Sequence, residues 1–303
     1  MPAIPSREMR PILSFLALWA ISTLYLAARG ADWVFPIVSL VIFGTALPAL
    51  AWWLTRRSDA PPVPVTHPRR EGLGLLLYLA VYAVLFVGIL FTTIRSAVPA
   101  GREQELAMLG FKLLIHVILP AGLLLFLGGR VAPMWDAGLS RRGFWPVLLV
   151  VGGILVALVA VASPSLRSIA ALDLAPGATA FWIAATFVWM SVEAGLCEEF
   201  LFRAALQSRL QAWLASPAAA ITLTSVLFAL SHAPGLYLRG GPGTDGWSTD
   251  PVQVAAFTVA TLAPISLLFG VIWLRTRSLL LVVLLHGAVD MLPNTADMVR
   301  TWG

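Results

Sequence analysis

Apolar residues in this sequence come in runs of about 20, the length of helix that crosses ~30 Å of hydrocarbon. Inside lipid the backbone N–H and C=O groups have to bond within the protein, which leaves helices and closed barrels as spanning structures. The alternating pattern of a barrel strand is absent. With 59% hydrophobic residues, 12% charged residues and a mean hydropathy of +0.88, the chain is expected to be an all-α, polytopic membrane protein. We expect a helical bundle of about eight or nine transmembrane segments.

The candidate segments lie near residues 12–28, 33–54, 73–94, 108–127, 145–162, 178–212, 217–233, 252–274 and 279–293. If all nine cross the membrane, thirteen of the 20 Lys and Arg residues fall on the side of the N-terminus. Because cytoplasmic loops are enriched in these residues, we expect a multi-pass protein of the cell membrane with a cytoplasmic N-terminus. The pI near 10.1 then reflects basic loops that face lipid headgroups, and no nucleic-acid-binding motif accompanies it. The bilayer is the expected partner, nucleic acid is not, and the oligomeric state stays open.

Three short polar clusters interrupt the apolar second half of the chain. Ionisable side chains are costly in hydrocarbon, so clusters at this depth indicate a functional site. They are Glu198-Glu199-Phe-Leu-Phe-Arg203, Phe228-Ala-Leu-Ser-His232 and His286-Gly-Ala-Val-Asp290.

The spacing within the first cluster separates two roles. Glu199 and Arg203 are four residues apart, so on a helix they share a face and can form an ion pair. Glu198 points about 100° away from Glu199. Glu198 is therefore expected to be free to accept a proton, as a general base must be.

The three clusters are also expected to meet at one depth. If Ser216-Pro217 is a turn, Glu198 and His232 both lie roughly 22–27 Å from it along antiparallel helices. His286 lies only ~13 Å from the turn of its own hairpin. We expect His286 to lie at the same depth as Glu198 and His232 nevertheless, because the polar stretch 207–211 would project into water before the chain reverses. The Gly- and Pro-rich residues 233–250 are expected to form a connecting loop or a lid over the site.

This order of motifs, EExxxR, FxxxH and HxxxN/D within a multi-helix membrane protein, resembles the CPBP family (CAAX protease and bacteriocin-processing, also called Abi) of intramembrane proteases. The Ras-converting CAAX endopeptidase is a eukaryotic relative of that family. The resemblance covers roughly residues 178–295. It divides the chain into transmembrane helices without a motif (1–177), a protease core (178–295) and a short C-terminal tail (296–303).

The resemblance implies an intramembrane endopeptidase that acts on membrane-associated or lipidated substrates, in CAAX-type, C-terminal or bacteriocin processing. By position, Glu198 matches the glutamate that activates water, and His232 assists it. Glu199 and Arg203 match a supporting pair, and His286 and Asp290 match residues that bind the oxyanion. Oxyanion binding requires donors, which an ionised Asp290 lacks, so we expect Asp290 to orient His286 instead.

A glutamate and two histidines are also a ligand set for zinc, and for a metalloprotease the ligands would be Glu198, His232 and His286. The helical HExxH signature of zinc peptidases is absent, which favours a mechanism that requires no cofactor.

Two other functions remain open from the residues alone. Buried acids and histidines also relay protons in proton-coupled transporters, and an immunity protein on the same fold would not cleave peptides. Lys112, His116 and Glu193 lie in or near apolar segments and match no motif. We expect them to serve packing, a water cavity or the membrane interface.

Overall fold

The computed structural model describes residues 6–58 and 60–303, and this part of the chain contains helices and no strand. Nine helical stretches within it are long and apolar enough to cross a membrane, which confirms the all-α, polytopic fold. They run over Arg7–Ala28, Val34–Leu54, Pro68–Ala97, Arg102–Phe126, Phe144–Ala162, Pro176–Leu214, Pro217–Arg239, Pro251–Thr276 and Leu279–Trp302.

Several of these stretches alternate between α-helical and π-helical turns. In the first half the elements are α1 (Ser6–Ala28), α2 (Val34–Ser39), η1 (Leu40–Ala46), α3 (Leu47–Leu54), α4 (Pro68–Val81), η2 (Tyr82–Leu90), α5 (Phe91–Ala97), α6 (Arg102–Leu113), η3 (Leu114–Ile118), α7 (Leu119–Phe126) and η4 (Ala132–Trp135, a 3₁₀ turn). In the second half they are α8 (Phe144–Pro146), η5 (Val147–Val151), α9 (Gly152–Ala162), α10 (Ser165–Ala170), α11 (Pro176–Met190), η6 (Ser191–Leu196), α12 (Cys197–Glu199), η7 (Phe200–Gln207), α13 (Ser208–Leu214), α14 (Pro217–Arg239), α15 (Pro251–Thr276) and α16 (Leu279–Trp302).

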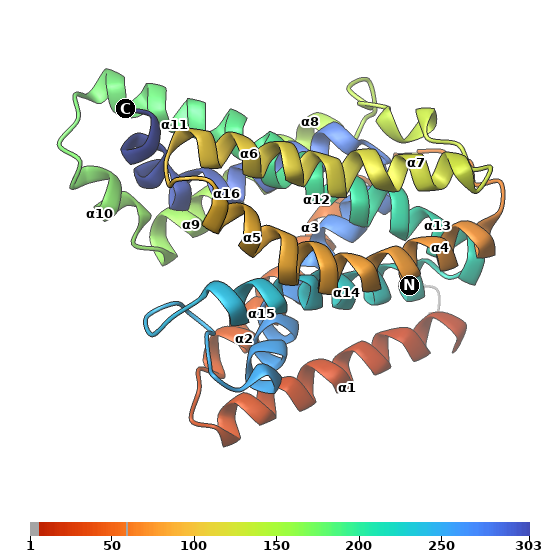
Figure 1. Cartoon of the computed structure of the whole chain (residues 1–303). Coiled ribbons are helices and arrows are strands. Elements are labelled where there is room, and N and C mark those ends of the chain that lie inside the picture. The colour runs from red at the N-terminus through yellow and green to blue at the C-terminus, as the bar shows by residue number, and fades with distance from the viewer. Residues whose placement is uncertain (1–5, 59) are drawn as a thin grey trace.

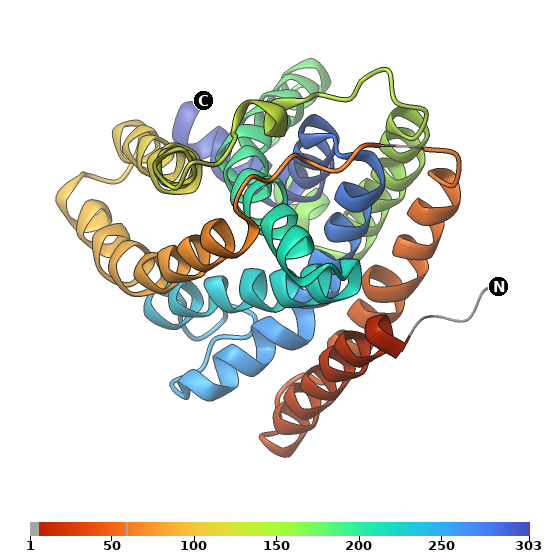
Figure 2. The ribbon, with the colours of Figure 1, turned by 90° about the vertical axis from the view of Figure 1, so that its right-hand side faces the viewer.

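The last two helices form the interior of the bundle. In the most apolar window of each helix, 72% of the residues of α15 and 61% of those of α16 are buried, against 22% for α1. Figure 1 shows α1 along one edge of the bundle, and Figure 2 shows the blue C-terminal helices among the others. Helices buried on all sides hold polar groups away from lipid, so this interior is where a polar site can be built.

Two helices extend beyond their predicted ends. α14 continues to Arg239 rather than ending near residue 233, although Pro234 lies inside it. Proline removes one backbone donor, but membrane helices tolerate this loss where neighbouring groups take up the freed carbonyl. The loop that follows is therefore shorter than expected and begins at Gly240. α16 continues to Trp302 rather than ending near residue 293, so residues 296–302 prolong a helix.

The expectation that residues 207–211 project into water is wrong. Gln207 and Arg209 are buried. The Gln207 amide donates to the Gly270 carbonyl at 2.9 Å, and Arg209 forms an ion pair with the buried Glu71 at 3.0 Å. Each polar group finds a partner on a neighbouring helix, so the chain can keep these side chains inside the bundle.

Candidate active site

The two adjacent glutamates lie in an unusual stretch of helix. Glu198 and Glu199 belong to the three-residue α12, with the π-helical η6 before it and η7 after it. π-helical stretches also occur in η1, η2, η3 and η5, so this feature is not confined to the region of the glutamates. Despite this irregularity, Arg203 still reaches Glu199, with its Nε 3.1 Å from Oε2.

Glu198 lies between two histidines from other helices. Its Oε2 is 3.7 Å from Nε2 of His232 on α14 and 3.7 Å from Nε2 of His286 on α16. This oxygen is buried, and in the described part of the chain it has no hydrogen-bond partner. A distance of 3.7 Å is too long for a direct hydrogen bond, but it suits polar groups that share a bridging water.

The other nitrogen of each imidazole is already engaged. His232 Nδ1 lies 2.8 Å from the Phe228 carbonyl, which can only accept, so Nδ1 carries the proton. His286 Nδ1 lies 2.7 Å from Glu199 Oε1, and this nitrogen donates to the carboxylate in the same way. Both Nε2 atoms are therefore the ones presented to Glu198.

Glu199 and Arg203 form the buried support of the site. Both side chains are fully enclosed, at 0% exposure. The Arg203 guanidinium also donates to Ser266 Oγ at 2.9 Å, and it lies 4.5 Å from the ring of Phe228. Since Glu199 contacts Arg203 with one oxygen and His286 with the other, a single carboxylate fixes the position of that imidazole.

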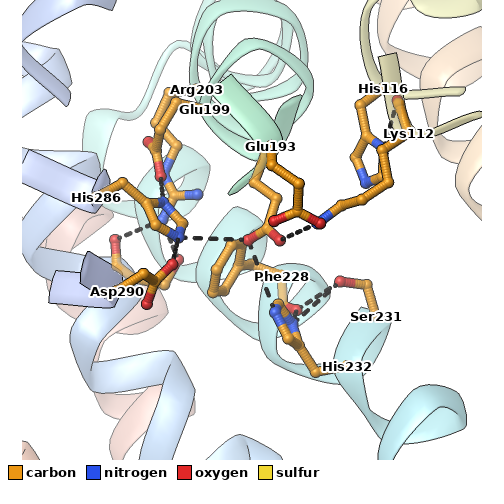
Figure 3. A network of polar contacts seen from close by, with 12 residues as sticks. Lys112, His116, Glu193, Glu199, Arg203, Phe228, Ser231, His232, His286 and Asp290 are labelled. Carbon is orange, nitrogen blue, oxygen red and sulfur yellow. Dashed lines mark hydrogen bonds and ion pairs between the residues drawn. The ribbon is translucent and has the colours of Figure 1, made fainter. Parts of the chain in front are cut away.

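All six residues singled out from the sequence lie in one polar cluster, most of which Figure 3 labels. Asp290 lies beside His286, as expected, but it contacts a different nitrogen of the ring from the one that Glu199 contacts. Its Oδ2 is 3.4 Å from His286 Nε2, on the nitrogen that faces Glu198, while Glu199 binds Nδ1. Glu199 therefore contacts the His286 ring on the side that faces away from Glu198, and Asp290 contacts it on the side of Glu198.

A cavity of about 400 Å³ opens beside Glu198 and His232. Lys112 and His116 of the preceding region of the chain line it, together with Tyr82. Lys112 Nζ is 2.7 Å from Glu193 Oε1 and 4.0 Å from Glu198 Oε1, so this cation faces the site. Lys112 matches no motif, and the sequence signal for its role is the position of this cation inside an apolar run.

His116 is held in place on the same wall. Its Nδ1 lies 2.9 Å from the Lys112 carbonyl and its Nε2 lies 3.0 Å from the Tyr82 hydroxyl. These contacts lock the ring into the helix wall, which makes a packing role for His116 sufficient to explain its burial.

No group of three His, Cys, Asp or Glu side chains within residues 6–58 and 60–303 is arranged to hold a metal ion. Glu198, His232 and His286 do meet, with Glu198 Oε2 3.7 Å from the Nε2 atom of each histidine. Two donors that bind one zinc ion at ~2.0–2.2 Å lie about 3.4 Å from one another, so these three side chains are the candidate ligands of a metalloprotease.

The fold and the cluster together define a multi-pass membrane protein whose carboxylate–histidine centre is built from side chains of its last four spans. A family model, type II CAAX prenyl endopeptidase Rce1-like, matches residues 179–292, which contain all three motifs. This match confirms the resemblance to CPBP membrane proteases and supports a peptidase as the general class of the protein. Comparisons with curated proteins and with solved structures gave no significant match. The first five spans lie outside the matched range.

Proposed function

We propose that this protein is an intramembrane endopeptidase in which Glu198 activates water for attack on a peptide carbonyl. The observation that carries the proposal is the position of Glu198 Oε2, buried and 3.7 Å from the Nε2 atoms of both His232 and His286. The family match at residues 179–292 supports a peptidase over the other functions that such a cluster could serve.

Binding of the water follows from the protonation of His232. With its proton on Nδ1, neutral His232 presents a lone pair on Nε2 toward Glu198. Two acceptors facing one another are both satisfied by a water that donates one hydrogen to each. Its oxygen lone pairs then remain free for the attack, and as the C–O bond forms Glu198 takes up one proton as general base.

His286 is proposed to stabilise the oxyanion of the tetrahedral intermediate. Its Nδ1–H is donated to Glu199, and a second proton on Nε2 is favoured by Glu198 and Asp290, both within 4 Å. The resulting Nε2–H is a donor that is already oriented, and such donors make large contributions to transition-state stabilisation. When the oxyanion collapses and the C–N bond breaks, the proton held by Glu198 passes to the leaving amine, and the products are a carboxylic acid and a free amine.

The substrates are proposed to be membrane-associated or lipidated proteins cleaved near the C-terminus, as in CAAX-type processing, or related bacteriocin-like peptides. The site is enclosed by spanning helices, so a peptide bond reaches it from a segment already held in the bilayer. The cavity beside Glu198 combines polar groups with apolar walls that include Phe91, Phe257 and Leu262, which suits a peptide with apolar side chains.

The test is peptide cleavage by purified protein in lipid vesicles. Glu198→Gln and His232→Ala are expected to abolish cleavage while the protein stays folded in the membrane. Glu103→Gln, at the exposed start of α6, is the control and is expected to cleave normally. Normal cleavage by both site variants would reject the mechanism. Proton-coupled uptake by the wild-type protein without any cleavage would favour a transporter.

We further propose that the reaction requires no metal. Cleavage is then expected to persist after dialysis against a chelator, with no zinc found by elemental analysis. Loss of cleavage that zinc restores would show a metalloprotease, with Glu198, His232 and His286 as the candidate ligands.

We also propose that the N-terminus is cytoplasmic, on the basis of the distribution of basic residues. Reporter fusions at both ends of the chain test this, and nine crossings place the two ends on opposite sides.

A further inference from the structure

A second, smaller cleft approaches the site from another direction. It has a volume of about 230 Å³ and lies between helices α5 and α6 on one side and α11 and α16 on the other. Its outer part contains Arg95 and Asp297, both exposed, and its inner part contains Met190, which is only 8% exposed. Glu193 lines the cleft as well, one turn of helix beyond Met190. The cleft thus leads from the surface of the protein toward its interior.

From Glu193 a chain of charged groups continues to the proposed general base. Glu193 Oε1 contacts Lys112 Nζ at 2.7 Å, and this ammonium is 4.0 Å from Glu198 Oε1. Glu193 lines the cleft and Lys112 lines the catalytic cavity, so their ion pair forms the boundary between the two spaces. Figure 3 shows Glu193 and Lys112 pointing toward one another at the edge of the cluster.

A second polar connection runs along α16. Asn294 lines the cleft, and its amide donates to the Asp290 carbonyl at 2.8 Å. The side-chain carboxylate of the same Asp290, a separate group from this backbone carbonyl, lies 3.4 Å from His286 Nε2. The inner end of the cleft is therefore joined by contacts to the catalytic carboxylate through Lys112, and along α16 it lies one turn of helix from Asp290.

We infer that this cleft is the binding site and entry route for the water consumed in hydrolysis, with the Lys112–Glu193 pair at its inner end. The inference rests on the proposed function, because a hydrolase enclosed by lipid-facing helices has to admit one water for each bond cleaved. A peptide that fills the 400 Å³ cavity displaces water from that side. The cleft ends at Glu193, whose partner Lys112 lies 4.0 Å from Glu198, and its polar lining stabilises water in the interior.

Cysteine accessibility tests the route in lipid vesicles. Cys197 is the only cysteine in the sequence and is buried, so Cys197→Ala provides a background without thiols. In that background Met298→Cys probes the outer part of the cleft and Met190→Cys its inner part. Val188→Cys is the matched control, because Val188 lies on the same helix as Met190 and is 63% exposed on the outer surface.

Both cleft variants are expected to react with a charged, membrane-impermeant methanethiosulfonate, whereas Val188→Cys, facing lipid, is not. The adduct at Met298→Cys is expected to lower the cleavage rate by about tenfold, and a reductant that removes it is expected to restore the rate. A Met298→Cys protein that reacts while Met190→Cys does not would show that the cleft ends before Glu193 and would overturn the inference. An adduct that leaves cleavage unchanged would overturn it too.

The two arms separate this inference from the proposed function. If Met190→Cys is labelled but the protein cleaves no peptide, the cleft is hydrated and the proposed peptidase function is rejected. If the protein cleaves peptides but Met190→Cys is not labelled, the peptidase function stands and the cleft is rejected as the water route.

Discussion

Glu199 Oε1 accepts a hydrogen bond from His286 Nδ1 at 2.7 Å, across 87 residues of sequence. The other oxygen of the same carboxylate is 3.1 Å from Arg203 Nε, a contact whose angle makes it an ion pair rather than a well-aligned hydrogen bond. Glu199 therefore joins the helix of the EExxxR motif to α16. Without the hydrogen bond from Glu199, the His286 imidazole would be free to rotate away from Glu198.

The two adjacent glutamates should respond differently to the same substitution. Glu199→Gln leaves the buried Arg203 without a counter-charge, and breaking a buried pair in this way costs about 3–5 kcal/mol of stability. Glu198→Gln breaks no hydrogen bond among the described residues, so it should abolish cleavage with little loss of stability. Thermal unfolding in detergent measures the difference. Equal losses of stability for the two variants would contradict the assigned division of roles.

A second buried pair, Glu71 with Arg209, should matter for folding only. Arg209 also donates to the Arg130 carbonyl at 2.8 Å, and Glu71 accepts from the His67 amide at 2.7 Å, so the pair ties α4, α13 and the loop before η4 together. Glu71→Leu alone leaves the buried Arg209 guanidinium without its counter-charge, so it should lower the free energy of unfolding by about 3–5 kcal/mol.

The double variant Glu71→Leu with Arg209→Met should recover part of that loss, because it removes both charges at once. Unfolding in detergent compares the variants. A double variant as unstable as the sum of the two single variants would show that the charges act independently.

Acid should weaken the contact between α1 and the start of α15. The Tyr25 hydroxyl donates a hydrogen bond to the Asp250 carboxylate at 2.8 Å, and the Arg29 guanidinium donates to the same oxygen at 2.5 Å. These contacts hold the pKa of the Asp250 carboxyl below its usual value. Because the folded-state pKa lies below the unfolded one, the contact stabilises the protein above about pH 4. This contribution is lost as the pH falls through the folded-state pKa.

Asp250→Asn should accordingly lower the unfolding temperature at pH 7, and the difference from wild type should shrink on acidification toward pH 3. Asp297→Asn, which alters only an exposed pair with Arg300, serves as the control and should have almost no effect. A constant difference between Asp250→Asn and wild type at every pH would refute the electrostatic explanation.

Gly195 should be required for the close packing of α16 against η6, because no larger residue fits between the two helices. A Cβ atom there would lie 2.6 Å from the backbone carbonyl oxygen of Val283, one turn before His286. Gly195→Ala should therefore push α16 away, cost about 1–3 kcal/mol and reduce cleavage. Gly153→Ala, where a Cβ meets nothing within 4 Å, is the control. The control should be neutral or slightly stabilising, since alanine favours helix. Full activity of Gly195→Ala would show that the close approach is dispensable.

The helical fold and the members of the site could be predicted from local patterns. Apolar runs of spanning length predict helices because the backbone has no other partner in lipid. The i, i+4 spacing predicted that Glu199 and Arg203 would pair, and they do. The π-helical turns around Glu198 could not be predicted, because they depend on packing between helices rather than on the residues of one helix.

The sequence by itself determined that about eight or nine apolar segments have the length to cross a membrane, and that three clusters of costly polar residues lie in the last four. Only the tertiary structure decided which of those groups touch. It paired Glu199 with His286, brought Lys112 from a distant helix to Glu198, and buried Arg209 against Glu71. The physical reason is that a buried charge needs a partner within a few ångström, and sequence spacing specifies such partners only within one helix.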